Sequence, residues 1–451
     1  MGNDVTRRTF LGGVGAATAA ALPAVRALAQ SRRRRAARPN VIFILADDLG
    51  YGDLSCYGRP DYETPVLDGL AREGLRFTSA YAAAPVCTPT RCAFITGRYP
   101  QRFAVGLQEP LTLFSPPVGL PQGQPTVASL LRAAGYETAL VGKWHLGWRP
   151  EFQPRRFGFD EFFGSLSGAL DYFTHVAPDA GRELGAEPDL WENETRVRRE
   201  GYLTELFTER AVELIERPHD KPFYLSLHYT APHSPWEGPA DAGVDHDDHG
   251  PGPMIEGGSL SAYAAMMRSM DEGIGRVLET LRRSRLERDT LVIFTSDNGG
   301  ERYSYHWPFS FQKLYLHEGG TRVPAIVRWP GVVPAGRVTD QAAITMDWTA
   351  TILAVAGAAP DPLHPLDGED LTPVLTGERG EHDRELFWRT RTRAAARIGR
   401  WKYLHDGEEG LFDLAVDPGE KVNLKAKHPD VFERVRARYE AWNAQMLPRP
   451  S

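Results

Sequence analysis

The chain has 451 residues, of which 42% are hydrophobic and 25% charged, and its formal net charge is −7 at pH 7. These values are typical of a globular protein with one large or two unequal domains, and the acidic balance argues against nucleic acid as a partner. The three cysteines, Cys56, Cys87 and Cys92, are too few for a disulfide framework or a zinc ligand set. A bond between Cys56 and Cys92 stays open, because the sequence does not give their distance.

The N-terminal segment 1–29 has the pattern of an export signal. Arg7 and Arg8 form a twin-arginine motif, an apolar run rich in Ala and Gly follows, and Ala27-Leu28-Ala29 matches a cleavage site. The alternative is a membrane anchor, but the apolar run is short for a span of about 20 residues. We expect the twin-arginine translocase to export the protein to the periplasm or the medium, with no stable membrane anchor. Residues 30–38 read as a basic linker.

The first predicted strand, Asn40–Leu45, is continuously apolar from Val41 onward, as in a parallel sheet that is covered on both faces. Asp47 and Asp48 follow it directly. Two adjacent carboxylates repel each other unless cations pair with them, and the functional crevice of an α/β sheet lies at the carboxyl ends of its strands. The alternative is that they belong to a turn or cap a helix. We expect a functional pair.

A helix opened by Thr64-Pro65 and a short strand at 75–78 lead to the segment Pro85–Ala93. Here Thr88 is the expected N-cap of a second helix and Pro89 its first residue. Cys87 would then lie just outside the helix, where the free N–H groups favour an anion and lower the pKa of a thiol. The alternative is that Cys87 is a small buried apolar residue.

Two later strands also end in charged or imidazole side chains. A helix capped by Thr126 precedes a strand at 138–141, and Lys143 and His145 follow; two residues apart in extended backbone, they would face the same side. The strand 223–227 leads to His233, which lies between two prolines in a segment that cannot be helical. A lone histidine is more often structural, but one presented rigidly beyond a strand end is a candidate for catalysis.

The strand 291–295 follows a long helix at 262–281 and ends in Asp297-Asn298, as the first strand ends in Asp47-Asp48. Four oxygen-bearing side chains are therefore expected at one edge of the sheet. Such ligands suit calcium or magnesium rather than zinc.

The rest of the chain divides by composition. Lys313 precedes a strand at 325–329 and a helix at 347–356, which complete a catalytic α/β domain at 39–358. A linker at 359–383 is rich in Pro, Gly and Asp. Residues 384–451 read as short antiparallel strands with a closing helix, and so predict a smaller C-terminal domain.

Several of these motifs carry a family resemblance. Cys87-Thr88-Pro89-Thr90-Arg91, followed by Thr96-Gly97-Arg98-Tyr99-Pro100, resembles the signature of type I sulfatases in the alkaline-phosphatase-like superfamily. The likeness extends from Pro39 to the end of the chain. It implies an α/β fold in which helices sandwich a large mixed central sheet, with a smaller C-terminal antiparallel sheet.

The resemblance also implies roles for single residues. Cys87 would be oxidised by a formylglycine-generating enzyme to formylglycine (3-oxoalanine), whose hydrated aldehyde attacks sulfur. One Ca²⁺ would be held by Asp47, Asp48, Asp297, Asn298 and the modified residue 87. Arg91 would anchor the gem-diol and the carboxylates. Lys143, Lys313 and His233 would bind the substrate, His233 would protonate the leaving oxygen, and His145 would contact the second hydroxyl of the gem-diol.

The implied activity is hydrolysis of a sulfate monoester, either an aryl sulfate or a sulfated sugar such as N-acetylgalactosamine sulfate. The loop Glu301–Gln312, rich in Tyr, His and Trp, is expected to influence substrate choice. One alternative is a phosphoester or phosphonate hydrolase of the same superfamily. Another is a calcium-dependent glycan-binding protein in which Cys87 stays a thiol. Binding alone does not require Lys143, His145, His233 and Lys313 together, so the sequence favours the sulfatase.

Overall fold

The computed structural model describes residues 38–112, 115, 117–177, 187–242 and 257–450. The expected signal peptide at 1–29 and all but the last residue of the basic linker lie outside the described residues. Export by the twin-arginine route therefore stays a prediction. Among the described helices, none combines the length and the apolar character that a membrane span requires.

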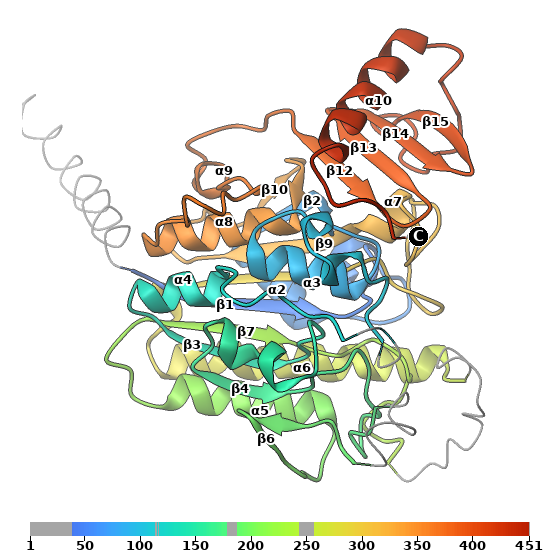
Figure 1. The fold of residues 1–451 in the computed structure, drawn as a ribbon. Coiled ribbons are helices and arrows are strands. Elements are labelled where there is room, and N and C mark those ends of the chain that lie inside the picture. The colour runs from blue at the N-terminus through green and yellow to red at the C-terminus, as the bar shows by residue number, and fades with distance from the viewer. Residues whose placement is uncertain (1–37, 113–114, 116, 178–186, 243–256, 451) are drawn as a thin grey trace, which may run out of the picture.

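A mixed sheet of 11 strands forms the centre of the larger part of the molecule (Figure 1). Its strands follow the order β10-β2-β9-β8-β1-β7-β3-β4-β5-β6, with β11 paired to β2. β1, β7, β8, β3 and β4 are parallel, whereas β9 runs antiparallel to both β8 and β2. The bounds are β1 Asn40–Ala46, β2 Leu75–Tyr81, β3 Glu137–Gly142, β4 Glu161–Gly164, β5 Trp191–Glu192, β6 Thr195–Arg196, β7 Phe223–His228, β8 Thr290–Ser296, β9 Arg322–Arg328, β10 Arg337–Thr339 and β11 Ala343–Ile344.

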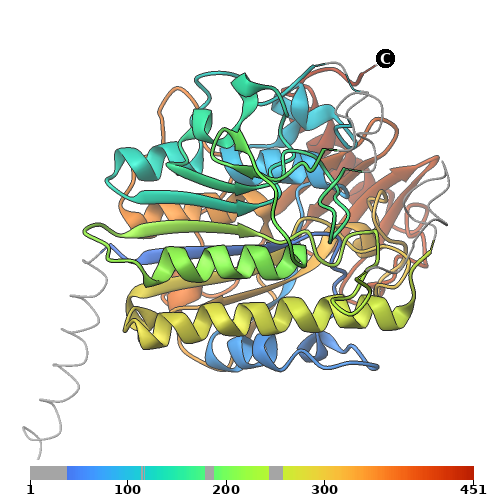
Figure 2. The same cartoon turned by 90° about the horizontal axis from the view of Figure 1, so that it is seen from below.

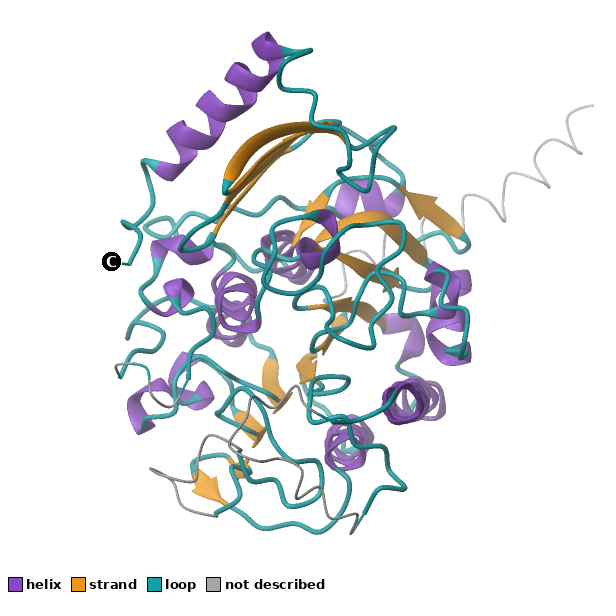
Figure 3. Cartoon of the chain, turned by 90° about the vertical axis from the view of Figure 1, so that its right-hand side faces the viewer, coloured by secondary structure: helices purple, strands orange, loops and turns teal. Residues whose placement is uncertain are grey.

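Helices cover both faces of this sheet (Figure 3). Alternate residues of β1 enter different cores: Ile42 and Ile44 pack with α2, α5 and α6, whereas Val41 and Phe43 pack with α3, α4 and α8. Figure 2 shows α5 and α6 side by side across one face. The bounds are α2 Pro65–Glu73, α3 Cys87–Thr96, α4 Val127–Ala133, α5 Leu203–Glu216, α6 Leu260–Arg283, α7 Glu318–Thr321, α8 Thr345–Ala356 and α9 Thr372–Thr376. Burial on both faces explains why β1 is apolar at every position from Val41 to Ala46.

The smaller sheet is antiparallel, with the order β12-β13-β14-β15, and α10 packs on it (Figure 1). Its elements are β12 Glu385–Arg389, β13 Ala394–Ile398, β14 Trp401–Asp406, β15 Glu408–Asp413 and α10 Pro429–Asn443. A core of its own includes Trp388 and Tyr403, and Tyr81 and Leu316 of the larger part enter the same core. The predicted fold class is confirmed. The domain limits 39–358, 359–383 and 384–451 stay predictions.

Buried charges also join the two parts. Nζ of Lys402 on β14 lies 2.8 Å from Oε1 of Glu318 on α7 and 2.8 Å from Oε1 of Glu420. Arg322 at the start of β9 pairs with the other oxygen of Glu318, 3.1 Å away. Lys402 and Glu318 are fully buried, so each depends on the other for compensation of its charge.

The three cysteines are all free. Cys56 packs against the core that contains α5 and α6, whereas Cys92 lies in the core on the opposite face of the sheet. The sheet between them rules out the bond that the sequence left open.

Candidate active site

The sequence-predicted site residues meet at one edge of the central sheet. β1 lies between β7 and β8, so the residues after these strands are neighbours. The Asp297 N–H donates to the Ala46 carbonyl (3.1 Å), and the Lys143 N–H donates to the His228 carbonyl (3.0 Å). Segments that are far apart in the sequence therefore present their side chains together, as expected for the carboxyl ends of parallel strands.

Each carboxylate at this edge faces a cation or an amide. The Lys143 ammonium lies 2.5 Å from Asp47 Oδ2, and the Lys313 ammonium lies 2.6 Å from Asp48 Oδ2. Arg91 NH2 lies 2.8 Å from Asp297 Oδ2 and 3.6 Å from Asp47 Oδ1. The Asn298 amide donates to Asp48 Oδ1 (2.7 Å). The expectation that these acids need cations is met, and all of these pairs lie in the interior.

The pKa values of the carboxyls in this cluster are shifted in different directions. Burial opposes ionisation of Asp48, but Lys313, His233 and Lys143 outweigh it and hold the pKa of this carboxyl well below its usual range. Burial and the neighbouring charge of Asp47 raise the pKa of Asp297 to about 7, although Arg91 opposes the rise. The rise at Asp297 follows mainly from burial, and a bound cation would favour the ionised form of this carboxyl.

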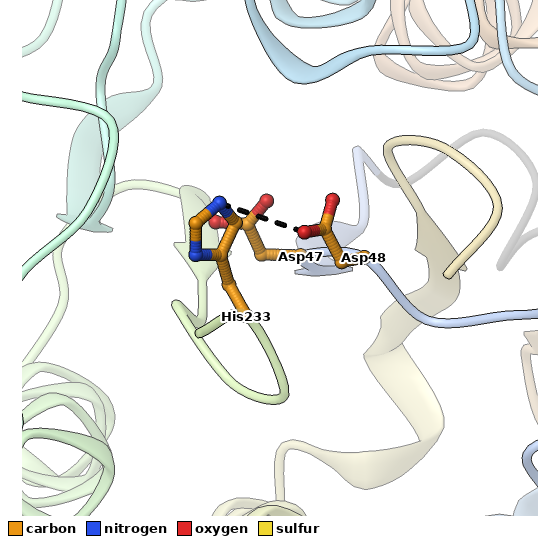
Figure 4. A group of neighbouring side chains, drawn as sticks. All are labelled: Asp47, Asp48 and His233. Carbon is orange, nitrogen blue, oxygen red and sulfur yellow. Dashed lines mark ion pairs between the residues drawn. The ribbon is translucent and has the colours of Figure 1, made fainter. Parts of the chain in front are cut away.

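A divalent cation fits these side chains. One ligand atom each from Asp47, Asp48 and His233 lies within 4.8 Å of the others (Figure 4). Oδ1 of Asp47 and Oδ1 of Asn298 are buried without a hydrogen-bond partner. Buried oxygens are costly when unpartnered, and a bound cation would satisfy them. The donors from Asp47, Asp48 and Asn298 are oxygen atoms, which suits a hard cation such as calcium.

Cys87 is the first residue of α3 rather than a residue outside it, so the predicted helix start is wrong by two residues. Thr88 does not cap the helix, because its hydroxyl accepts from the Leu111 N–H (3.0 Å). Val86 is the N-cap. The expected lowering of the thiol pKa is also wrong: burial raises the pKa of Cys87, and Lys143 offsets the rise only in part.

His145 lies at the site, but the alternation of side chains along an extended strand does not place it there. Its φ is 56°, in the left-handed region, so the backbone from Lys143 to His145 is not extended. Its Nε2 lies 2.7 Å from the Leu111 carbonyl, and its Nδ1 is buried without a partner. A Cβ at Gly168 would lie 2.4 Å from the ring, so glycine leaves room for it. Burial holds the pKa of His145 well below its ordinary value.

His233 lies over the carboxylates. Its Nε2 is 3.5 Å from Asp48 Oδ2 and 3.4 Å from the Lys313 ammonium, and its Nδ1 is 2.6 Å from the Ser234 carbonyl. Since a carbonyl only accepts, Nδ1 carries the ring proton. Burial lowers the pKa of His233 to about 4, although Asp48 opposes the shift.

Sequence reasoning missed two residues in contact with this cluster. Glu301 Oε1 lies 2.9 Å from the Lys313 ammonium, so Lys313 is held between two carboxylates. His228, the last residue of β7, is buried with its Nδ1 3.1 Å from the Lys143 carbonyl and 3.5 Å from Arg91 NH1. The strand-end rule that selected Asp47 would also have selected His228. Glu301 comes five residues after β8, as His233 comes five residues after β7, so the same rule extended to that distance would have included it.

Comparison with known proteins agrees with this arrangement. Residues 39–358 match the family model described as Sulfatase, and residues 306–443 match that of the N-sulphoglucosamine sulphohydrolase C-terminal region. The chain is 34% identical over 422 residues to N-acetylgalactosamine-6-sulfatase of Homo sapiens, covering 86% of this chain and 77% of that protein. It is 34% identical over 438 residues to Arylsulfatase A of Homo sapiens, covering 86% and 83%.

Solved structures give the same result. Ps i-CgsB superposes with a TM-score of 0.80 at 31% identity, covering 90% of this chain and 93% of that one. The PsFucS1 sulfatase from Pseudoalteromonas sp. superposes with a TM-score of 0.77 at 26% identity, covering 95% of each chain. The chain therefore belongs to the formylglycine-type sulfatase family of the alkaline-phosphatase-like superfamily and is a sulfuric ester hydrolase.

Proposed function

We propose that the protein hydrolyses sulfate monoesters of carbohydrates, N-acetylgalactosamine 6-sulfate or a similar sugar, with formylglycine at position 87 and one bound Ca²⁺. Relatives named N-acetylgalactosamine-6-sulfatase, at 34% identity over most of both chains, support this substrate class. The observation that carries the proposal is the pairing of Lys143 and Lys313 with buried carboxylates beside Cys87. Once a bound cation takes over Asp47 and Asp48, the two ammonium groups are available to an anionic group of the substrate.

Part of the chemistry comes from two groups, formylglycine at position 87 and a bound calcium ion. Formylglycine, once hydrated, supplies a nucleophilic hydroxyl and a second hydroxyl through which the aldehyde is regenerated. Calcium, held by Asp47, Asp48, Asp297 and Asn298, supplies positive charge for the sulfate oxygens and for the ionised hydroxyl. The unpartnered oxygens of Asp47 and Asn298 support this ligand set.

The side chains of the protein bind the anion and move protons. Lys143 and Lys313 offer ammonium groups to the sulfate oxygens, and Arg91 holds Asp297 and Asp47 in place. His145 has Nε2 on the Leu111 carbonyl, so Nδ1 carries no proton in the neutral ring. That atom is the base for the second hydroxyl of residue 87.

His233 is the general acid of the proposal. With Nδ1 on the Ser234 carbonyl, only Nε2 is free to donate to the leaving oxygen, so His233 must bind a second proton first. A sulfate next to Nε2 raises the pKa of His233 from its low value, because a neighbouring anion stabilises the imidazolium. Binding of substrate thus prepares the acid.

Maturation and export belong to the same proposal. A formylglycine-generating enzyme would modify Cys87 in the cytoplasm, and the twin-arginine translocase, which carries folded proteins, would then export the protein to the periplasm or the medium. The motif at Arg7-Arg8 and the signature from Cys87 to Arg91 support this order.

The test combines one mass measurement with two substrates. The peptide that contains Cys87 is examined by mass spectrometry after co-expression with a formylglycine-generating enzyme, and hydrolysis of 4-nitrophenyl sulfate and 4-nitrophenyl phosphate is compared. We expect an aldehyde at 87 and faster sulfate hydrolysis. Faster phosphate hydrolysis by the modified protein would favour a phosphoester hydrolase, and an aldehyde without any turnover would refute the proposal.

A further inference from the structure

Large apolar side chains are exposed beside the candidate site. Trp307 is 70% exposed, Phe311 52% and Leu314 47%, all within a short stretch that also contains Lys313. Exposed apolar groups that gather next to a cleft mark binding surfaces more often than isolated ones do. We call Phe311, Leu314 and the half-buried Tyr315 the apolar rim.

The apolar rim is tied to the site by the backbone. The Lys313 N–H donates to the Gly300 carbonyl (3.1 Å), just after Asp297 and Asn298. The Leu314 N–H donates to the Pro85 carbonyl (2.8 Å), two residues before Cys87. Phe311 and Leu314 therefore lie on either side of Lys313, whose ammonium contacts Asp48.

The rim is held in an unfavourable backbone conformation. Phe311 has φ 62° and Leu314 φ 74°, in the left-handed region that bulky residues rarely adopt. Such a conformation persists where the surroundings fix it, and it occurs mainly at ligand-binding segments. Here it turns two apolar side chains toward solvent, where their exposed surface adds nothing to the stability of the fold.

Neighbouring side chains fix the rim. The Phe311 ring stacks on His317 with centroids 3.9 Å apart and lies 4.8 Å from Tyr315. The Arg393 guanidinium lies 4.5 Å from the Tyr315 ring centroid, and its NH1 donates to the Leu314 carbonyl (3.3 Å). Arg393 directly precedes β13 of the smaller sheet, so both parts of the molecule build this surface. The rim is preformed rather than adaptable.

We infer that the apolar rim binds the C–H face of a second sugar ring, the neighbour of the sulfated one, so that the enzyme prefers an oligosaccharide to a monosaccharide. The inference rests on the proposed function. A sugar ring has one apolar face, and a rigid aromatic surface with a cation at its edge matches that chemistry. The rim is a few side chains wide, far smaller than the roughly 800 Å² per partner of a stable protein interface.

The test compares two substrates that share the reacting group. N-acetylgalactosamine 6-sulfate is compared with a chondroitin 6-sulfate trisaccharide that carries the same residue at its non-reducing end. In wild type, kcat/KM for the trisaccharide exceeds that for the monosaccharide. In Phe311→Ala and Leu314→Ala this ratio falls by about tenfold, the equivalent of one lost aromatic or apolar contact.

Two further variants separate recognition from structure. Phe311→Tyr keeps the ring and keeps the ratio, whereas Leu363→Ala, an apolar residue that is 84% exposed elsewhere, leaves the ratio at its wild-type value. Equal kcat/KM for the two sugars in wild type, or an unchanged ratio in Phe311→Ala and Leu314→Ala, overturns the inference while sulfatase activity stands. Absence of hydrolysis of every sulfate ester by protein with formylglycine at 87 would refute the proposed function itself.

Discussion

Lys143→Met removes one charge from a buried ion pair and leaves the packing volume nearly intact. The Lys143 ammonium is 2.5 Å from Asp47 Oδ2, and both side chains are completely shielded from solvent. After the change, the nearest cation to Asp47 is Arg91, 3.6 Å from the other oxygen. Breaking a buried ion pair destabilises the folded state by about 3–5 kcal/mol. Because Arg91 remains, we expect the free energy of unfolding to fall by an amount near the lower limit, about 3 kcal/mol.

Calcium should change this loss. An ion bound to Asp47 compensates the charge of the same carboxylate. The decrease in the free energy of unfolding caused by Lys143→Met should therefore shrink to about 1 kcal/mol at saturating calcium. Urea unfolding of the unmodified protein, in EGTA and in calcium, measures both values. The double variant Asp47→Asn/Lys143→Met is the control, because it removes both charges and should recover most of the loss. A loss below about 1 kcal/mol in EGTA, or the same loss in both buffers, would show that the pair does not carry the energy assigned to it.

Three further predictions concern catalysis, metal binding and pH. Cys87→Ala should abolish turnover with an unchanged circular dichroism spectrum, and residual sulfatase activity would contradict the role of this residue. Asp297→Ala should lose bound calcium as well as activity, and metal analysis that finds a full equivalent would remove Asp297 from the ligand set. Asp271 accepts hydrogen bonds from the Val66 and Leu67 N–H groups at the start of α2, and burial raises the pKa of its carboxyl from 3.8 to about 6. Because the folded state binds this proton more tightly, wild type should lose roughly 2 kcal/mol relative to Asp271→Asn between pH 4 and pH 7, measured by urea unfolding at both pH values. Equal pH dependence of the two proteins would show that Asp271 titrates normally.

The sequence predicted much of the site because local patterns carried the information. Buried apolar runs identified β1 and β8, and the residues after them, Asp47 and Asp297, do lie together. A strand that is covered on both faces is apolar throughout, so its carboxyl end is visible in the sequence. The order of the strands is not, because it depends on contacts between distant segments.

The errors in the sequence-based prediction came from tertiary contacts that override local rules. Thr88 is a good cap by propensity, yet its hydroxyl is engaged by the Leu111 N–H, and α3 begins two residues earlier. His145 was placed by strand alternation, but its left-handed backbone breaks the alternation. Glu301 lies in the loop after β8, and only the folded chain shows that it shares Lys313 with Asp48.

The buried bridge between Lys402 and Glu318 bears on how the chain can be shortened. A protein truncated before β12 would retain every side chain of the proposed catalytic apparatus, yet Glu318 would lose one of its two cations. Lys313, five residues upstream of Glu318, would then lie next to a destabilised segment. The smaller sheet is therefore an integral support of the catalytic part, and a minimal active fragment has to include it.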